Sequence, residues 1–261
     1  MKLAIEPWRT LKFGELRVYI FGNSIDLAAK AAGDLADVIV ESVASRGVAS
    51  IILSTGNSQL QLMVALRQLR NLPWSKVLIF HLDEYLGMSE EHPASFRRYL
   101  RENLVDVVHP GEFFKLRGDA PDSAAEIRRY TSLLRQYPAD ICVIGIGENG
   151  HLAFNDPPAK FETTELIHIV ELDEDCRRQQ VGEGHFANLE EVPQRALSLT
   201  IPAMLSARHV LGIVPEKRKA QAVKLALQGA VTPECPASIL QTQPHAQLYL
   251  DRESSSLLVG I

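Results

Sequence analysis

The 261-residue chain has little cysteine, no excess of basic residues and no long apolar run. Its three cysteines, Cys142, Cys176 and Cys235, form no Cys-x-x-Cys pair, and their odd number favours free thiols in a reducing compartment. No segment has the length of a membrane span, and residues 1–12 are too polar for a signal peptide. These absences predict a cytoplasmic protein that does not bind a membrane.

The charges are balanced. The chain has 27 Lys and Arg residues against 32 Asp and Glu residues, a net charge of -5, without a basic cluster of the kind that binds nucleic acid. With 46% hydrophobic and 23% charged residues, the composition is typical of a globular protein. We expect residues 1–261 to form one domain with a small-molecule partner. A homo-oligomer is compatible with this composition, but the sequence does not specify one.

Several motifs that are typical of cofactor-binding proteins or of common hydrolases are absent. The chain has no His-Glu-x-x-His, no Cys-x-x-Cys and no Gly-x-Ser-x-Gly, so neither catalytic zinc nor a serine nucleophile is indicated. Residues 145–150 match the dinucleotide-binding pattern Gly-x-Gly-x-x-Gly, but Pro157 and Pro158 interrupt the helix that must follow such a turn. We therefore expect neither a metal nor an organic cofactor.

Short apolar runs alternate with helical patterns along the chain. Strands are predicted at 16–21, 49–53, 77–82, 141–146, 166–172, 196–199, 210–214 and 247–250. Helices are predicted at 24–47, 60–69, 93–103, 124–137, 174–180 and 217–228, the first with Ser24 as its N-cap. This order predicts an α/β fold: a Rossmann-like, mostly parallel, twisted sheet with helices on both faces. The segment 181–193 is a candidate mobile flap.

Polar loops follow several of these strands, and parallel strands present their carboxyl ends at one edge of the sheet. The first loop consists of Ser54, Thr55, Gly56, Asn57 and Ser58. It leads into a helix whose free N–H groups and positive dipole end suit a phosphate. The alternative interpretation is a helix cap formed by one of its polar side chains.

Asp83 and Glu84 directly follow the apolar strand 77–82, where an unpaired carboxylate is costly. One of them is a candidate general base, and the alternative is an acidic cap ahead of the next helix. Because this loop lies at the same edge of the sheet as His151, we favour a role in catalysis.

His151 follows Gly150 at the end of the most apolar strand, and Glu148, Asn149 and Asp156 flank it. An imidazole at the carboxyl end of a parallel strand is a candidate acid–base catalyst, and a nearby acid can orient its ring and raise its proton affinity. The alternative is a structural histidine.

These loops resemble the glucosamine-6-phosphate deaminase/isomerase family, which shares its fold with the 6-phosphogluconolactonases. The resemblance runs from about residue 51 to residue 250. Its most specific parts are Leu-Asp-Glu-Tyr-Leu-Gly at 82–87, Glu-His-Pro-Ala-Ser-Phe at 91–96 and the glycine-rich segment 145–157. Lactonases typically have Asp-Glu-Arg at the first motif and Gly-His-Thr-Ala in the third, so both differences favour the deaminase branch.

The resemblance implies conversion of an amino-sugar phosphate to a ketose phosphate and ammonia, without a redox cofactor. Asp83 would move a proton from C2 to C1 of the opened sugar through an enolamine, and His151 would assist ring opening. Lys219 matches the phosphate lysine of the family. We also expect Glu84, Gly150 and the loop at 54–58 to contact the substrate.

The chain departs from the family beside the catalytic histidine. The family usually has Asp at the position of Asn149 and Glu at the position of Asp156. An amide can orient an imidazole but supplies no charge, so Glu148 or Asp156 is expected to supply it.

The chain also departs from the family at the phosphate clamp, because residues 164–169 contain neither the Arg nor the Lys that the family has there. Arg177 and Arg178 are candidate substitutes, since a guanidinium binds phosphate with paired donors; the alternative is a solvated helix face. Three functions follow from the sequence: a deaminase/isomerase for glucosamine 6-phosphate or a related sugar phosphate, a 6-phosphogluconolactonase, or a non-catalytic sugar-phosphate-binding protein.

Overall fold

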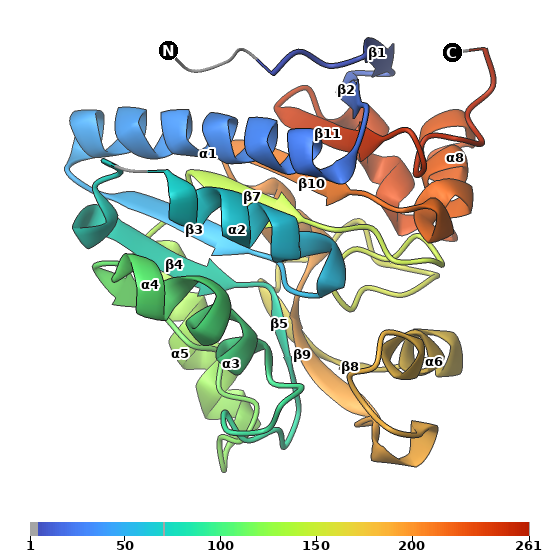
Figure 1. Cartoon of the computed structure of the whole chain (residues 1–261). Coiled ribbons are helices and arrows are strands. Elements are labelled where there is room, and N and C mark those ends of the chain that lie inside the picture. Colours follow the sequence, from blue (N-terminus) through green and yellow to red (C-terminus); the bar gives the residue numbers. More distant parts are fainter. Residues whose placement is uncertain (1–4, 70, 261) are drawn as a thin grey trace.

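The computed structural model describes residues 5–69 and 71–260, and a twisted eight-stranded sheet runs through it (Figure 1). The strand order is β1-β2-β11-β10-β7-β3-β4-β6. Neighbouring strands are parallel except for the hairpin of β1 and β2. The strands of this sheet are β1 (Arg9–Phe13), β2 (Leu16–Phe21), β3 (Ala49–Leu53), β4 (Val77–His81), β6 (Glu112–Phe113), β7 (Ile141–Ile144), β10 (His209–Val214) and β11 (Ala246–Asp251).

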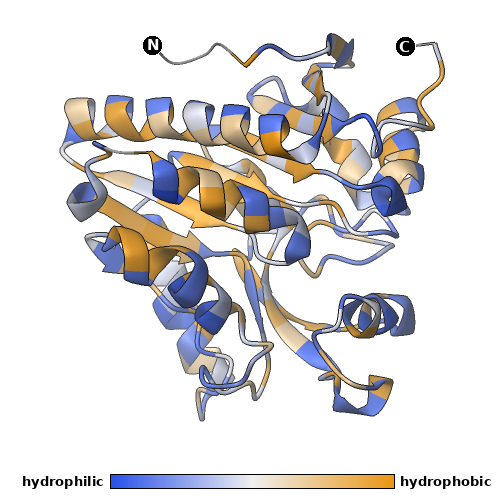
Figure 2. Ribbon diagram, viewed as in Figure 1, coloured by the Kyte–Doolittle hydropathy of each residue, from blue (hydrophilic) through white to orange (hydrophobic). Residues whose placement is uncertain are grey.

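Helices cover both faces of the sheet, which confirms the predicted α/β fold. The helices are α1 (Ser24–Arg46), α2 (Leu60–Gln68), α3 (Phe96–Leu100), α4 (Asp106–Val108), α5 (Ser123–Gln136), α6 (Glu174–Gly182), α7 (Ile201–Leu205) and α8 (Ala220–Gln228). Helices α1 and α2 and the α3–α4 segment pack on one face, and α5, α7 and α8 pack on the other. The central strands are apolar along their length, whereas the helices are apolar on one side only (Figure 2).

A separate three-stranded antiparallel sheet lies below the carboxyl edge of the large one and was not predicted as a sheet. It has the order β5 (Asp83–Tyr85), β9 (Arg195–Leu199) and β8 (Ile167–Glu171), and it leads into α6. Strand β5 has only three residues, two of them acidic, and acids have low strand propensity. Its pairing with β9 makes it a strand, so the predicted loop at 83–85 is corrected.

Two predicted helix starts also need correction. The N-cap of α1 is Asn23 rather than Ser24, because the Asn23 side chain accepts a 2.9 Å hydrogen bond from the Asp26 N–H. The helix predicted from Pro93 begins at Phe96, where the hydroxyl of Ser95 caps it.

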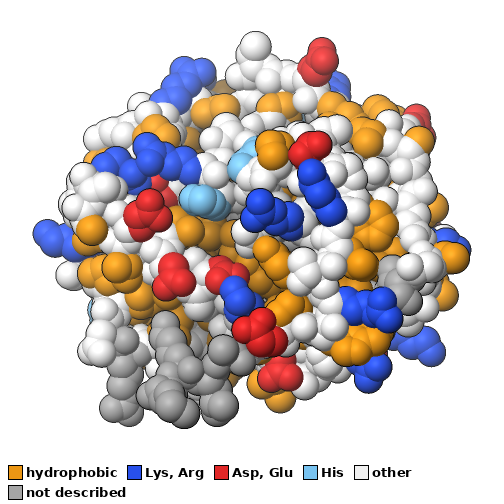
Figure 3. All heavy atoms as spheres, turned by 90° about the horizontal axis from the view of Figure 1, so that it is seen from above, with side chains coloured by type: hydrophobic (Ala, Val, Ile, Leu, Met, Phe, Trp, Pro, Cys, Tyr) orange, Lys and Arg blue, Asp and Glu red, His pale blue; other side chains and the backbone are white. Residues whose placement is uncertain are grey.

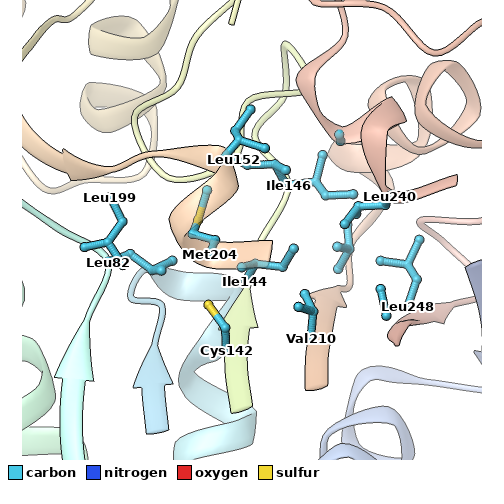
Figure 4. Packing of buried hydrophobic residues seen from close by; sticks show 14 of the residues in the cluster. Leu82, Cys142, Ile144, Ile146, Leu152, Leu199, Met204, Val210, Leu240 and Leu248 are labelled. Carbon is cyan, nitrogen blue, oxygen red and sulfur yellow. The ribbon is translucent and has the colours of Figure 1, made fainter. Parts of the chain in front are cut away.

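The core below the sheet edge anchors the residues that flank Asp83 and His151 (Figure 4). Leu82 lies beside Leu199, and Leu152 and Ile146 lie on the other side of Met204. These side chains are almost completely buried. The three cysteines are unpaired, as the sequence predicts, and all three are buried.

Seen from above, the molecular surface intersperses acidic and basic side chains with separate apolar ones (Figure 3). Single exposed apolar residues are normal on a protein surface. None of the helices over residues 5–69 and 71–260 combines the length and the apolar character that crossing a membrane requires.

Candidate active site

A cleft opens at the carboxyl edge of the large sheet and holds about 590 Å³ of empty space, the solvent at its mouth included. Loops after β3, β4, β7 and β10 form its floor, and α6 forms one wall. Its lining includes Ser54, Thr55, Gly56, Ser58, Asp83, Phe96, Gly145, Gly147, His151, Phe154, Gln179, Gln180, Glu183 and Lys219. The structure therefore brings together the three loops that the sequence places at one edge.

The glycine-rich turn after β7 is shaped around His151. A Cβ at Gly147 would lie 2.3 Å from atoms of the His151 ring, so only glycine lets the ring pack against this backbone. Gly150 has a φ of +88°, which also favours glycine, but it does not line the cleft. No helix follows the turn, which agrees with the rejection of a dinucleotide site.

Asp156 supplies the negative charge beside the imidazole. Its Oδ1 lies 3.0 Å from Nδ1 of His151 and accepts a 3.0 Å hydrogen bond from the Asn149 side-chain amide. The Asn149 side-chain oxygen accepts a 3.0 Å hydrogen bond from the His151 N–H. Burial opposes ionisation of Asp156, but His151 and Asn149 outweigh this effect and lower the pKa of the carboxyl.

Glu148, the other acid expected to supply this charge, points elsewhere. It is exposed and pairs with Arg218 at 3.2 Å, outside the cleft. Asn149 therefore connects His151 to an acid five residues further along the chain. The charge missing at position 149 is restored by Asp156 rather than by Glu148.

Asp83 lies at the bottom of the cleft and is almost completely buried. Burial and the neighbouring carboxyl of Glu84 raise the pKa of Asp83 well above its usual value. Among the described residues, none donates a hydrogen bond to its side chain. A buried carboxyl without a protein partner is suited to exchanging protons with a ligand.

Glu84 does not reach the cleft, so its expected contact with substrate is corrected. Its carboxylate accepts hydrogen bonds from the Ser95 hydroxyl at 2.7 Å and from the Arg97 Nε at 3.2 Å. Three backbone N–H groups, from Tyr85, Phe96 and Arg97, also donate to it. Glu84 is fully buried and has all its bonding capacity used inside the protein.

The loop after β3 and Lys219 form a positively polarised end of the cleft. The Ser54 hydroxyl is buried and has no hydrogen-bond partner among the described residues, and Gly56 has a φ of +98°. The Lys219 ammonium is buried, and no described carboxylate lies within 4.0 Å of it. Burial lowers the pKa of Lys219. An anionic ligand would satisfy these groups together.

Three other residues expected to contact the substrate, Asn57, Arg177 and Arg178, lie away from the end of the cleft formed by Lys219 and the loop after β3. The Asn57 side chain donates to the Glu183 carbonyl at 3.2 Å and does not line the cleft. Arg177 donates to the carbonyls of Leu189 and Val192, at 2.5 and 3.1 Å.

Arg178 is exposed and pairs with Glu174 one turn earlier on α6. The two arginines therefore do not replace the missing clamp, because the rotation of α6 turns both away from the cleft.

Sequence reasoning missed three cleft residues from α6 and its end. The Gln180 side-chain oxygen accepts a 2.8 Å hydrogen bond from the Tyr85 hydroxyl, and Gln179 donates to Glu183 at 2.8 Å. Glu183 also pairs with Arg218 at 2.6 Å, and this cluster lowers its pKa to about 2 despite burial. Adjacent glutamines on a short polar helix give little signal in a sequence. The mobility of the segment 181–193 stays a prediction.

Fold and cleft together define a class: an α/β protein whose ligand site lies beyond the carboxyl ends of parallel strands and carries acid–base and anion-binding groups. A family model described as glucosamine-6-phosphate isomerases/6-phosphogluconolactonase matches residues 22–250. The chain belongs to this family.

Individual relatives place the chain within the family. It is 36% identical to the glucosamine-6-phosphate deaminase of Exiguobacterium sibiricum, over 80% of this chain and 81% of the relative. It is 34% identical to the Streptococcus pneumoniae enzyme of the same name, over 87% and 94%.

Solved structures extend the comparison. A monomeric glucosamine-6-phosphate deaminase of the NagB superfamily superposes with a TM-score of 0.85 and 31% identity, covering 92% of this chain and 99% of that one. A 6-phosphogluconolactonase from Shewanella baltica has a TM-score of 0.74 at 21% identity, covering 90% and 96%, and shows the shared fold alone.

Proposed function

We propose that this protein is a glucosamine-6-phosphate deaminase/isomerase, which converts glucosamine 6-phosphate and water to fructose 6-phosphate and ammonia. The observation that carries the proposal is the meeting of Asp83, His151 and Lys219 in one cleft. The relatives at 34–36% identity that cover most of the chain bear the deaminase name.

The substrate phosphate binds at the loop after β3 and Lys219. Ser54 offers a buried hydroxyl without a partner, and Lys219 offers a buried cation without a counter-ion. A dianionic phosphate supplies what both groups lack, and charge-assisted hydrogen bonds of this kind are the strong ones. The sugar then extends toward Asp83 and His151 on the other side of the cleft.

His151 opens the sugar ring. Because Nδ1 faces Asp156, Nε2 is the nitrogen available to the ligand. The imidazole donates a proton to the ring oxygen and accepts the proton of the C1 hydroxyl, which gives the open-chain aldehyde. The nearby Asp156 carboxylate stabilises the protonated imidazole during this exchange.

Asp83 then moves one proton. Its carboxylate removes the proton from C2, which gives the enolamine, and returns it to C1, which gives the imine at C2. Water adds to the imine, and ammonia leaves as the ketone forms. Burial and the neighbouring Glu84 raise the pKa of Asp83, so this carboxylate is a stronger base than an ordinary aspartate, as removal of the C2 proton requires.

Incubation of the purified protein with glucosamine 6-phosphate, followed by assays for ammonia and fructose 6-phosphate, tests the proposal. We expect the two products in equal amounts, and neither product from the Asp83→Asn variant. Folded protein that releases no ammonia from glucosamine 6-phosphate or any other amino-sugar phosphate would refute it.

The same preparation separates the two alternatives. A lactonase would open 6-phosphogluconolactone without ammonia release, and a binding protein would be stabilised against heat by a sugar phosphate without turnover. The structural likeness to lactonases at or below 21% identity supports the fold and not this activity.

A further inference from the structure

A cysteine lies beside the proposed His151–Asp156 pair and has no role in the proposed reaction. The Cys176 thiol on α6, one of the imidazole nitrogens of His151 and a carboxylate oxygen of Asp156 all lie within 4.8 Å of one another. Cys176 is 1% exposed, and the His151 and Asp156 side chains are 11% and 10% exposed. Three different metal-ligating groups therefore surround one small volume.

The groups in this cluster are not fully satisfied by one another. Oδ2 of Asp156 is buried and has no hydrogen-bond partner among the described residues, whereas Nδ1 of His151 faces Oδ1 of Asp156 at 3.0 Å. Buried polar atoms of this kind are rare and call for a ligand or another explanation.

A second hollow gives solvent a route to the cluster. It lies on the outer side of α6 and is lined by Cys176 and Asn149, together with Gln179 and Arg218. Cys176 lines this hollow although it is only 1% exposed, and the sugar phosphate would enter the cleft from the other side.

We propose that His151, Asp156 and Cys176 form a binding site for Zn²⁺, and that the bound ion blocks catalysis. Nitrogen, oxygen and sulfur donors together are the set that zinc prefers. Zinc bonds of 2.0–2.3 Å place tetrahedral ligands about 3.3–3.7 Å apart. The imidazole and the carboxylate, now 3.0 Å apart, would separate by a few tenths of an ångström. The thiol would move inward to complete the site.

Metal binding has a clear chemical consequence here. The thiol releases its proton to solvent as the zinc–sulfur bond forms. Without metal, the His151–Asp156 pair stays intact, with Nδ1 and Oδ1 3.0 Å apart. The ion therefore acts as a reversible inhibitor and not as a resident cofactor.

Direct binding tests the site without any reference to turnover. Isothermal titration of the chelator-treated protein with Zn²⁺ should give one site per chain, with affinity reduced at least about tenfold in Cys176→Ala. Co²⁺ should give the charge-transfer band of a thiolate ligand in the wild type and not in this variant. Cys235→Ala, which removes a buried cysteine outside the cluster, should behave as the wild type.

Equal zinc affinity in the wild type and in Cys176→Ala, or no zinc binding by the folded wild type, would overturn the proposal. If Cys176→Ala does not fold, Asp156→Asn provides the second variant, with the same expected loss of affinity.

Inhibition rests on the proposed function and is measured separately. Zn²⁺ should inhibit ammonia release by the wild type, chelation should restore it, and Cys176→Ala should need at least about tenfold more Zn²⁺ for the same inhibition. Zinc binding without deamination would leave the site standing and refute the proposed function. Deamination with equal zinc sensitivity in both proteins would refute the inhibitory site.

Discussion

Asp83 and Glu84 are neighbours on the same short strand, and both are buried, yet their hydrogen bonding is opposite. Glu84 accepts five hydrogen bonds, two of them from Arg97, whereas no described residue donates to the side chain of Asp83. Successive side chains of a strand point to opposite faces, so one acid faces the interior and the other the cleft. The comparison indicates that Asp83, the acid without hydrogen-bond partners in the protein, is the one available to a ligand.

Removing the carboxylate of Asp83 should give the largest effect. We expect Asp83→Asn to lower kcat about 10²- to 10⁴-fold, because proton transfer by a positioned carboxylate contributes about this much. Binding of the substrate should persist, as measured by thermal stabilisation with glucosamine 6-phosphate. Normal turnover in this variant would remove Asp83 from the mechanism.

Removing the partner of Glu84 should affect stability instead. Arg97→Met leaves a buried carboxylate without its cation, and we expect the free energy of unfolding to fall by about 3–5 kcal/mol in urea titrations. Adding Glu84→Gln should recover part of this loss. The adjacent Arg98, whose ion pair is partly exposed, provides the control: Arg98→Met should cost no more than about 0.5 kcal/mol.

Lys219 sharpens the comparison because it too is buried without a counter-ion. We expect Lys219→Met to raise KM about 10- to 150-fold, the value of one or more lost charge-assisted hydrogen bonds. Lys217→Met, two residues away and exposed, should leave KM unchanged. A fall in kcat with unchanged KM would place Lys219 outside the phosphate site.

The stability of Asp83→Asn should depend on pH with a definite sign. The folded pKa of Asp83 is raised, so the wild type loses stability as the pH rises from the unfolded pKa toward the folded one. The variant should therefore be more stable than the wild type at neutral pH, as measured by urea titration. This advantage should disappear as the pH falls to the unfolded value near 3.8. Equal stability across the whole range would show that Asp83 is not desolvated.

The smallest effect is expected at Arg178. Arg178→Ala should change KM less than about twofold and stability by no more than about 0.5 kcal/mol, because this side chain is exposed and pairs only with Glu174. A large rise in KM would return Arg178 to the phosphate site.

The sequence predicts the meeting of Asp83 and His151 because the carboxyl ends of parallel strands share an edge. Strong apolar runs located those strands, and polar residues after them stood out. The same reasoning placed Asp156 and Glu148 as alternatives but did not choose between them. That choice depends on the path of the backbone after Gly150, where Asn149 connects His151 to Asp156.

Other parts of the site depend on contacts that no local pattern records. Arg97 reaches Glu84 across a turn of 13 residues, and β5 becomes a strand only by pairing with β9. Arg177 has the positive charge that would suit a phosphate. The orientation of α6, however, directs its side chain to backbone carbonyls. Charge could be read from the sequence, whereas the direction of a side chain on a short polar helix could not.

Because Gly147 packs closely against the His151 ring, positions 147 and 149 of this loop should differ in how well they tolerate substitution. A side chain at 147 would have to displace the His151 ring, because its Cβ would lie 2.3 Å from ring atoms. Position 149 is half-buried and acts through hydrogen bonds, so an amide can replace an acid when another carboxylate stands nearby. Mutational drift in such loops should therefore accumulate in the residues that hold the histidine, and spare the glycine that makes room for it.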